Sequence, residues 1–200
     1  MSPKTVADQL VQQLVDAGVS RIYGIVGDSL NPIVDAVRRT GGSEKGGIDW
    51  IHVRHEEAAA FAAAADAEIT GKLAVCAGSC GPGNLHLING LYDAHRSGAP
   101  VLAIASHIPS AQIGMGYFQE THPERIFIEC SSYTELVSTA VQSPRVVQSA
   151  IQHSVARNGV SVIVLPGDIA DCPAEGTPPT LVETRRPTVV PDAGDVKALA

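Results

Sequence analysis

The sequence predicts an α/β fold, a doubly wound six-stranded parallel sheet in a three-layer α/β/α arrangement. Six short apolar runs alternate with segments of helical periodicity, and glycine-rich or polar loops follow several of these runs. Short buried strands separated by helices are typical of parallel sheets whose two faces are covered by helices. With 44% hydrophobic residues, a chain of 200 residues can also build the core of one domain of ordinary size.

The first two helices have recognisable starts and ends. Thr5 and Asp8 have the spacing of a capping box, and apolar residues then recur at helical spacing until Gly18 ends the helix. The second helix follows the turn at residues 27–29, carries an apolar stripe with i, i+3, i+4 and i+7 spacing, and stops at the glycines 41–42.

The strand–helix step then repeats along the chain. We expect strands at residues 21–26, 49–53, 73–77, 101–106, 134–137 and 161–165. We expect the later helices near residues 57–70, 84–96, 124–129 and 144–158. Ligands of such sheets bind beyond the carboxyl ends of the strands. The loops predicted to meet there are 27–29, 55–56, 78–84 and 106–123.

The character of the chain changes near its end. We expect one domain at residues 1–171 and, at 172–200, an extended linker leading into a further domain, because prolines gather there while apolar residues become few. These prolines are Pro173, Pro178, Pro179, Pro187 and Pro191. Residues 192–200 begin a helix-like pattern that simply stops, so we expect this chain to be the front part of a longer one.

Composition excludes several classes of function. Acidic residues outnumber basic ones by 21 to 14, and no run of Lys or Arg interleaves with aromatic residues, so nucleic acid is not an expected partner. No segment has the roughly 18 apolar residues of a membrane span, and the amino terminus lacks the apolar core of a signal peptide. We therefore expect a soluble, cytoplasmic chain. Its cysteines match neither a zinc knuckle nor a disulfide framework, so we expect reduced thiols at Cys76, Cys80, Cys130 and Cys172.

Glu56 is the leading candidate for chemistry. It lies between a predicted strand and a predicted helix, and seven of the eight residues 58–65 of that helix are alanine. Such a helix has high propensity and little bulk, so neighbouring backbones can approach closely and the carboxyl group can become desolvated. A desolvated carboxyl group prefers to share a proton. The alternative is an ordinary acid in the first helical turn, facing water and stabilised by the helix dipole.

Three familiar motifs of other enzyme classes are incomplete in this sequence. The glycine-rich loop at residues 78–84 has the spacing of a P-loop start, but Asn84 and Leu85 stand where Lys and Ser or Thr would be needed. Ser79 resembles the nucleophile of a hydrolase elbow, although no well-placed His follows it. Ala59 occupies the position of the second His in an HExxH zinc motif, so we expect no metal ligands in the site.

The histidines divide into two groups. His52, His95 and His153 are expected to be surface or structural residues. His86, His107 and His122 fall in or beside the predicted crevice loops, where a functional and a scaffold role are equally compatible with the pattern.

Taken together, four ordered motifs resemble the amino-terminal pyrimidine-binding domain of thiamine-diphosphate enzymes, in particular the pyruvate oxidase and pyruvate dehydrogenase (quinone) family. They are YGIVGDSLN at 23–31, RHEE at 54–57, CAGSCGPGNLHLINGL at 76–91 and GYFQETHP at 116–123. The likeness extends over residues 5–172. The His-Glu and Gly-Pro-Gly elements are similar in acetolactate synthases too, whereas the last motif points to the pyruvate-oxidising branch.

The resemblance implies a role for each site residue. Glu56 would be catalytic, because a carboxyl group at the pyrimidine nitrogen N1′ promotes the imino form of thiamine that activates its C2 carbon. The residues lining the cofactor crevice would be Val26, Gly27, Asp28, Glu56, Pro82 and Asn84. Those facing substrate would be His86, Phe118 and Gln119. Two structural alternatives stay open: Phe118 could merely pack, and the Gly-Pro-Gly turn could merely start a helix.

The resemblance also implies cofactors and partners. The full-length protein would use thiamine diphosphate, Mg²⁺ and FAD to decarboxylate pyruvate to acetate and CO2, passing electrons to a quinone. An acetolactate synthase-type carboligase domain and a non-catalytic dimerisation module are the alternatives. Since the diphosphate-anchoring motif and the FAD domain are absent, we expect this fragment alone to bind no cofactor and to be inactive. A homo-oligomer, dimer or tetramer, would share the site between chains, and a further segment could dock peripherally on the membrane.

Overall fold

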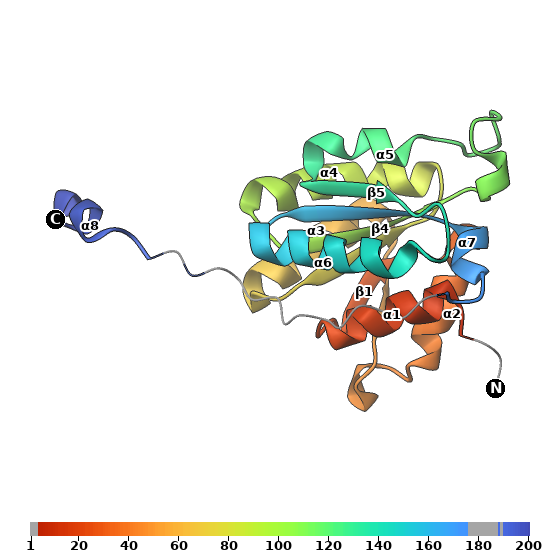
Figure 1. Cartoon of the computed structure of the whole chain (residues 1–200), viewed down its shortest axis with the longest axis horizontal. Helices are drawn as coiled ribbons and strands as arrows, with labels where there is room; N and C mark the ends of the chain where they lie inside the picture. Colours follow the sequence, from red (N-terminus) through yellow and green to blue (C-terminus); the bar gives the residue numbers. More distant parts are fainter. Residues whose placement is uncertain (1–3, 176–187, 189) are drawn as a thin grey trace.

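The computed structural model of the chain describes residues 4–175, 188 and 190–200, and its six strands confirm the predicted parallel sheet (Figure 1). Their order is β2-β1-β3-β4-β6-β5, and every neighbouring pair is parallel. The strands are β1 (Arg21–Gly24), β2 (Asp49–His52), β3 (Ala74–Gly78), β4 (Val101–His107), β5 (Tyr133–Leu136) and β6 (Val160–Pro166).

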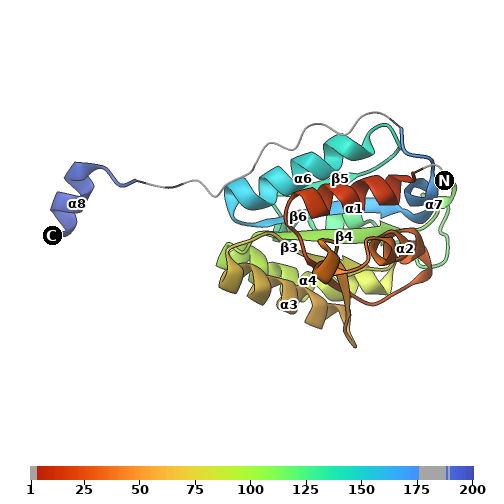
Figure 2. The same cartoon turned by 90° about the horizontal axis from the view of Figure 1, so that it is seen from below.

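Helices cover both faces of this sheet, as Figure 2 shows. One face carries α1 (Val6–Asp16), α2 (Asn31–Arg39), α6 (Ser143–Arg157) and α7 (Gly167–Asp171). The other carries α3 (Glu56–Thr70), α4 (Pro82–Ser97) and α5 (Pro123–Ile126). The predicted three-layer α/β/α architecture is therefore present.

Most of the predicted ends of helices and strands agree with the structure to within one or two residues, and two helical segments differ. The helix expected at 124–129 is divided into α5 and a 3-10 turn, Ile128–Cys130. The short helix α7 was not expected, because five residues are too few to show a helical period.

The carboxyl-terminal expectations fall largely on residues outside the described part, including Pro178, Pro179 and Pro187. Within the described part, residues 172–174 hydrogen-bond to residues 4–6, with Val6 N–H donating to the Cys172 carbonyl at 2.9 Å. The helical pattern expected from residue 192 is α8 (Ala193–Leu199), whose first turn is capped by the Asp192 side chain.

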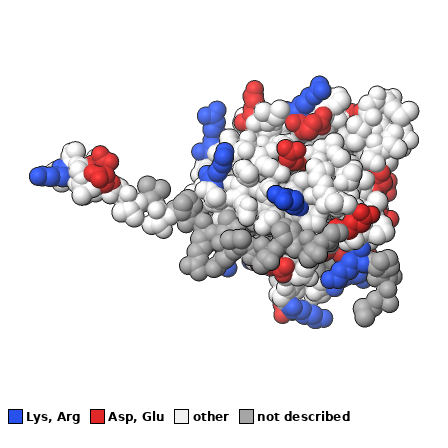
Figure 3. Space-filling model, viewed as in Figure 1, with Lys and Arg blue, Asp and Glu red and all other residues white. Residues whose placement is uncertain are grey.

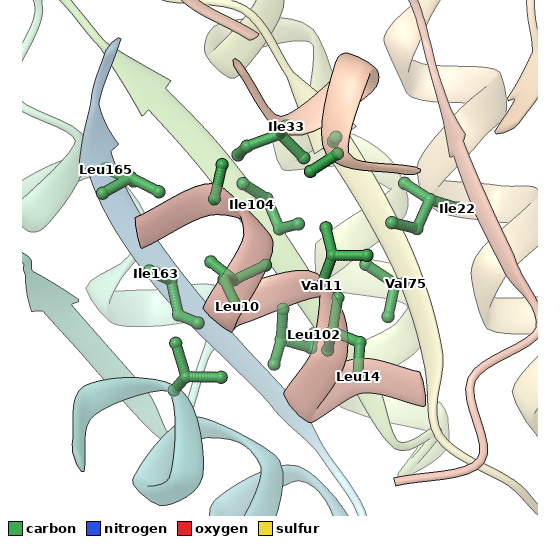
Figure 4. Close-up of a cluster of buried hydrophobic side chains, with 14 of the residues drawn as sticks. Leu10, Val11, Leu14, Ile22, Ile33, Val75, Leu102, Ile104, Ile163 and Leu165 are labelled. Carbon is green, nitrogen blue, oxygen red and sulfur yellow. The ribbon is translucent and has the colours of Figure 1, made fainter. Parts of the chain in front are cut away.

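The face that carries α1 has a core of large branched side chains. The predicted capping box starts this helix, because Thr5 and Asp8 bond each other's backbone N–H groups. Its buried leucines Leu10 and Leu14 then meet strand residues of β1, β3, β4 and β6. Figure 4 labels the strand partners Ile22, Val75, Leu102, Ile104, Ile163 and Leu165. We call this set, with Val11 and Ile33, the leucine face.

The opposite face is packed with small side chains along α3, although the buried Leu87, Leu91 and Phe127 also belong to it. Five buried alanines of α3 and the buried Ala94 of α4 line it, together with small residues of the strands. The two helices approach closely where Gly90 of α4 meets α3: a Cβ atom on Gly90 would lie 2.6 Å from the Ala60 Cβ and 2.8 Å from the Phe61 nitrogen. We call this side of the sheet the alanine face. Because α3 and α4 each follow a parallel strand, their amino termini lie at the same edge of the sheet, and the close contact brings them together there.

The structure agrees with the prediction of four cysteines outside disulfide bonds. All four cysteines are free, and Cys76 and Cys130 are buried in the alanine face. Burial raises the pKa of the Cys76 thiol to about 12 and that of Cys130 to about 11.

Charged side chains of both signs are spread over the surface, and both basic and acidic groups lie on the face seen in Figure 3. Within the part of the chain that the structure describes, no helix combines the length and apolar character needed to cross a bilayer.

Candidate functional site

A cavity of about 760 Å³ lies at the carboxyl edge of the sheet. From β1 the chain moves outward to β2, returns to β3 on the other side of β1, and continues to β4. Loops on either side of such a reversal diverge and leave a crevice. The four loops predicted to gather there all contribute to the wall, and α7 contributes as well.

Glu56 lies on the wall of this cavity, at the first residue of α3. It is buried, with 8% of its surface exposed, so the solvent-facing alternative is wrong. Space for the carboxyl group comes from Gly83 in the first turn of α4, where a Cβ atom would lie 3.2 Å from Glu56 Oε1. The alanine face therefore desolvates this acid while leaving it open toward the cavity.

His86 is the hydrogen-bond partner of this carboxyl group. Its Nδ1 lies 3.0 Å from Glu56 Oε2, and the imidazole, with 42% of its side chain exposed, reaches the cavity. The ring of His55 stacks on it, with 4.3 Å between the ring centroids. The pair can hold a proton between a nitrogen and a carboxylate oxygen, a typical arrangement for acid–base chemistry.

The other predicted cavity residues are placed by the segments after β1, β3 and β4. Val26, Gly27 and Asp28 line the cavity from the loop after β1, and Pro82 lines it from the start of α4, after β3. Phe118 and Gln119 line it from the loop after β4.

Phe118 is largely exposed, at 79%, so the alternative that it merely packs is wrong for this chain. Gln119 has a φ of 64°, and its side chain lies 3.7 Å from the Cys80 Sγ. A left-handed backbone at a residue other than glycine is strained and is often found at functional sites.

Asn84 does not line the cavity, contrary to our expectation. Its side chain is fully buried in α4, and its amide group donates a 2.7 Å hydrogen bond to the Ser106 carbonyl at the end of β4. Its amide oxygen is buried without a partner among the described residues. Asn84 therefore ties the start of α4 to the sheet, behind the wall that Pro82 and Gly83 form.

Two acidic residues of the cavity wall were not predicted from the sequence. They are Asp168 and Asp171 of α7, which line the cavity together with Asp28. The Asp168 carboxylate accepts hydrogen bonds from the Ser110 N–H at 2.9 Å and the Ser110 hydroxyl at 2.5 Å. The rule that ligands gather where parallel strands end could have found these residues, since Gly167 directly follows β6.

His107 also lines the cavity and is almost fully buried. Burial lowers the pKa of this imidazole, which is therefore neutral at pH 7. Its Nδ1 has no partner among the described residues. His122 lines a separate shallow depression with Tyr117 and Glu120.

The remaining candidates have structural surroundings. The Ser79 hydroxyl pairs with the Ser29 hydroxyl at 3.0 Å, which gives a hydrolase nucleophile no base. His153 stacks on Tyr133, His95 is half-buried and His52 is exposed, as expected for structural and surface residues.

Comparison with known proteins supports a family assignment. Residues 4–126 match the family described as thiamine pyrophosphate enzyme, N-terminal TPP binding domain. An uncharacterized 42.6 kDa protein of Pseudomonas amyloderamosa is 60% identical over all of this chain and half of its own length.

Other relatives have names that state an activity. A pyruvate oxidase of Lactiplantibacillus plantarum is 43% identical over 76% of this chain and 24% of its own length. The acetolactate synthase isozyme 2 large subunit of Escherichia coli is 33% identical over 82% of this chain and 29% of its own length. The chain thus spans half or less of the length of these relatives.

Proposed function

The chain belongs to the family of N-terminal TPP-binding domains of thiamine pyrophosphate enzymes, and on that premise we propose that it supplies the pyrimidine-binding half of an active site whose catalytic group is Glu56. The observation that carries this proposal is the Glu56 carboxyl group, buried yet facing a cavity, with His86 at 3.0 Å. The proposed role of Glu56 is to hold a proton at the pyrimidine N1′.

The cavity fits one end of thiamine diphosphate better than the other. A ring with a nitrogen acceptor fits between Glu56, Pro82 and Val26, which offer a carboxyl group and apolar surface. Three carboxylates, Asp28, Asp168 and Asp171, also line the cavity, and no Lys or Arg lines it among the described residues. An anionic diphosphate would be repelled there. The pyrimidine ring is therefore the part that this chain receives.

When bound, thiamine diphosphate would supply a nucleophilic carbon, formed by loss of the proton at C2, that adds to the carbonyl group of a 2-oxo acid. The residues of this chain prepare that chemistry. Glu56 would share a proton with the ring nitrogen through a hydrogen bond, because its carboxyl group is buried and still faces the cavity. His86 fixes the orientation of the carboxyl group, and Phe118 and Gln119 cover the side of the cavity from which a substrate would enter.

For the whole protein we propose a thiamine diphosphate- and FAD-dependent pyruvate:quinone oxidoreductase that releases acetate and CO2. The motif at 116–123 supports this reaction, and its Phe118 and Gln119 line the cavity. In this proposal another domain, with Mg²⁺, holds the diphosphate, and a second copy of the chain closes the site. An acetolactate-forming carboligase is the second candidate, because an acetolactate synthase is among the relatives.

The test is Glu56→Gln in the full-length protein, with Glu57→Gln as the matched control. Glu57 is the next residue on α3 and bonds Asn89 outside the cavity. We expect the Glu56 variant to fold and to lose about 10²- to 10⁴-fold in pyruvate turnover, as is typical when an acid–base group is removed. We expect the Glu57 variant to keep its turnover. Near-normal turnover of Glu56→Gln would overturn the catalytic role.

Product analysis separates the two candidate reactions. Acetate formed with reduction of a quinone supports the oxidoreductase, and acetolactate formed without an electron acceptor supports the carboligase. A protein that forms neither product while associating through this domain would leave the dimerisation module as its function.

A further inference from the structure

We propose that His55, Glu56 and His86 form a binding site for a divalent transition-metal ion, with Zn²⁺ as the best match, and that this ion excludes the pyrimidine ring. The sequence lacks a zinc motif because Ala59 follows where the second His of HExxH would stand. The fold supplies the second imidazole from a different helix. His86 of α4 lies beside the His55–Glu56 pair of α3, thirty residues away from Glu56.

The three side chains have the donor atoms and the spacing that a metal ion requires. One ligand atom from each lies within 4.8 Å of the others. Two nitrogens and one carboxylate oxygen form the His₂Glu set known from catalytic zinc sites, in which a fourth position stays open. At bond lengths of about 2.0–2.2 Å, two ligands of one ion are separated by roughly 3.5 Å. Glu56 Oε2 and His86 Nδ1 already lie 3.0 Å apart, so only ligand atoms that are farther apart, at up to 4.8 Å, have to move closer.

Both imidazoles can move to bring their ligand atoms around one ion beside Glu56. They are 50% exposed at His55 and 42% exposed at His86, so each can rotate without disturbing the core. The His55 Nδ1 accepts the Glu57 N–H at 3.3 Å as the cap of α3, so this ring either gives up that hydrogen bond or binds the ion through Nε2. Glu56 is held by the start of α3 and is only 11% exposed at its side chain, so it serves as the fixed ligand. Stacking of the two rings, with an interplanar angle of 26°, keeps the second and third ligands beside it.

The location of the cluster gives metal binding a consequence. Glu56 and His86 both line the cavity. An ion on the Glu56 carboxylate would occupy the oxygens that the proposed function assigns to the pyrimidine N1′. This second half of the inference rests on the proposed function, whereas metal binding itself does not.

Calorimetry with ZnCl₂ and absorption spectroscopy with CoCl₂ on the 200-residue chain test the metal site. We expect binding of one ion, with the spectrum of tetrahedral Co²⁺ bound to nitrogen and oxygen. His55→Ala, His86→Ala and Glu56→Gln should each weaken binding by at least about tenfold, since even changes beyond the metal ligands cost 10- to 100-fold. His52→Ala is the control, because this exposed imidazole at the end of β2 lies outside the cluster.

Two results would overturn the site. One is equal Zn²⁺ affinity of the wild-type chain and the His55→Ala/His86→Ala double variant, with circular dichroism showing that both are folded. The other is a sulfur-to-cobalt charge-transfer band, which would assign the ion to a cysteine. Should His86→Ala fail to fold, His86→Gln keeps the bulk of the side chain and provides the same comparison.

Inhibition of the full-length enzyme separates this inference from the proposed function. Zn²⁺ that competes with thiamine diphosphate, and competes at least about tenfold less well in His55→Ala, supports both. Zn²⁺ bound by the three side chains without such competition supports the metal site and contradicts the role of Glu56 at N1′. Loss of turnover in Glu56→Gln without Zn²⁺ binding supports the proposed function and overturns the metal site.

Discussion

The two faces of the sheet are packed with helix side chains of different size. On the leucine face, large branched side chains such as Leu10 and Leu14 fill the space between helix and sheet. On the alanine face, α3 and α4 meet through methyl groups and the bare backbone of Gly90. Large side chains bury more apolar area and so contribute more to stability, whereas small ones let helix termini approach. The candidate site stands at the end of the alanine face.

From this comparison of the two faces, we expect Leu10→Ala to cause the largest loss of stability and to leave the geometry of the candidate site almost unchanged. A buried Leu→Ala change typically lowers the free energy of unfolding by about 2–5 kcal/mol. Leu10 lies on the buried side of α1, where it is fully buried, and it does not line the cavity. Urea unfolding measures the loss, with Ile69→Ala, at an 85% exposed side chain, as a control expected to stay within about 0.5 kcal/mol.

A loss below about 1 kcal/mol for Leu10→Ala would mean that the leucine face does not carry the stability of the domain.

Gly90→Ala is expected to have a smaller effect on stability and a larger one on the site. Its new methyl group would clash with Ala60, and overpacking of this kind costs about 1–3 kcal/mol, offset in part by the better helix propensity of alanine. The helices must move apart, which separates Glu56 from His86. NMR shifts of the His86 ring should therefore change together with the unfolding midpoint.

The matched variant is Gly90→Ala combined with Ala60→Gly, which removes the methyl group that the new side chain meets. We expect it to restore the His86 shifts in part. Unchanged His86 shifts in the single variant would contradict the idea that this contact positions the site.

The smallest expected effect is that of Asp8 at the rim of the leucine face. Burial by itself would raise the pKa of this carboxyl group, but hydrogen bonds from Thr5 N–H and Arg39, with the charge of Arg39, lower it below 3.8. Because the folded state holds the carboxylate more strongly, its stabilisation is present above the unfolded-state pKa and is lost as pH falls through the lower folded-state value.

Asp8→Asn should therefore destabilise the protein at pH 7 by a few tenths to about 1 kcal/mol, and the gap to the wild type should close by pH 2–3. Urea midpoints at the two pH values check this. Asp16→Asn, at the other end of the same helix, is the control and should be neutral or slightly stabilising, because an acid there opposes the helix dipole. A gap for Asp8→Asn that is equal at both pH values would contradict the ionic origin.

Much of the fold could be predicted because it depends on local patterns. Apolar runs located all six strands, and the alanine-rich segment indicated a buried Glu56, since both signals lie within a few neighbouring residues. The stacking of His55 on His86 could not be predicted, because it depends on how closely two helices pack at Gly90. Our prediction that Asn84 lines the cavity was wrong. The glycine-rich segment before it lies at the cavity, but the Asn84 side chain turns back to bond Ser106.

The buried thiols of the alanine face have a practical consequence for chemical labelling. With pKa values of about 12 and 11, Cys76 and Cys130 are almost entirely protonated at neutral pH, and thiols in that form react poorly with alkylating agents and peroxide. Cys80 is also largely buried, at 9% exposure, but it lies on the cavity wall, beside Gln119. Its rate of modification can therefore report whether a ligand occupies the cavity, without introducing a foreign probe.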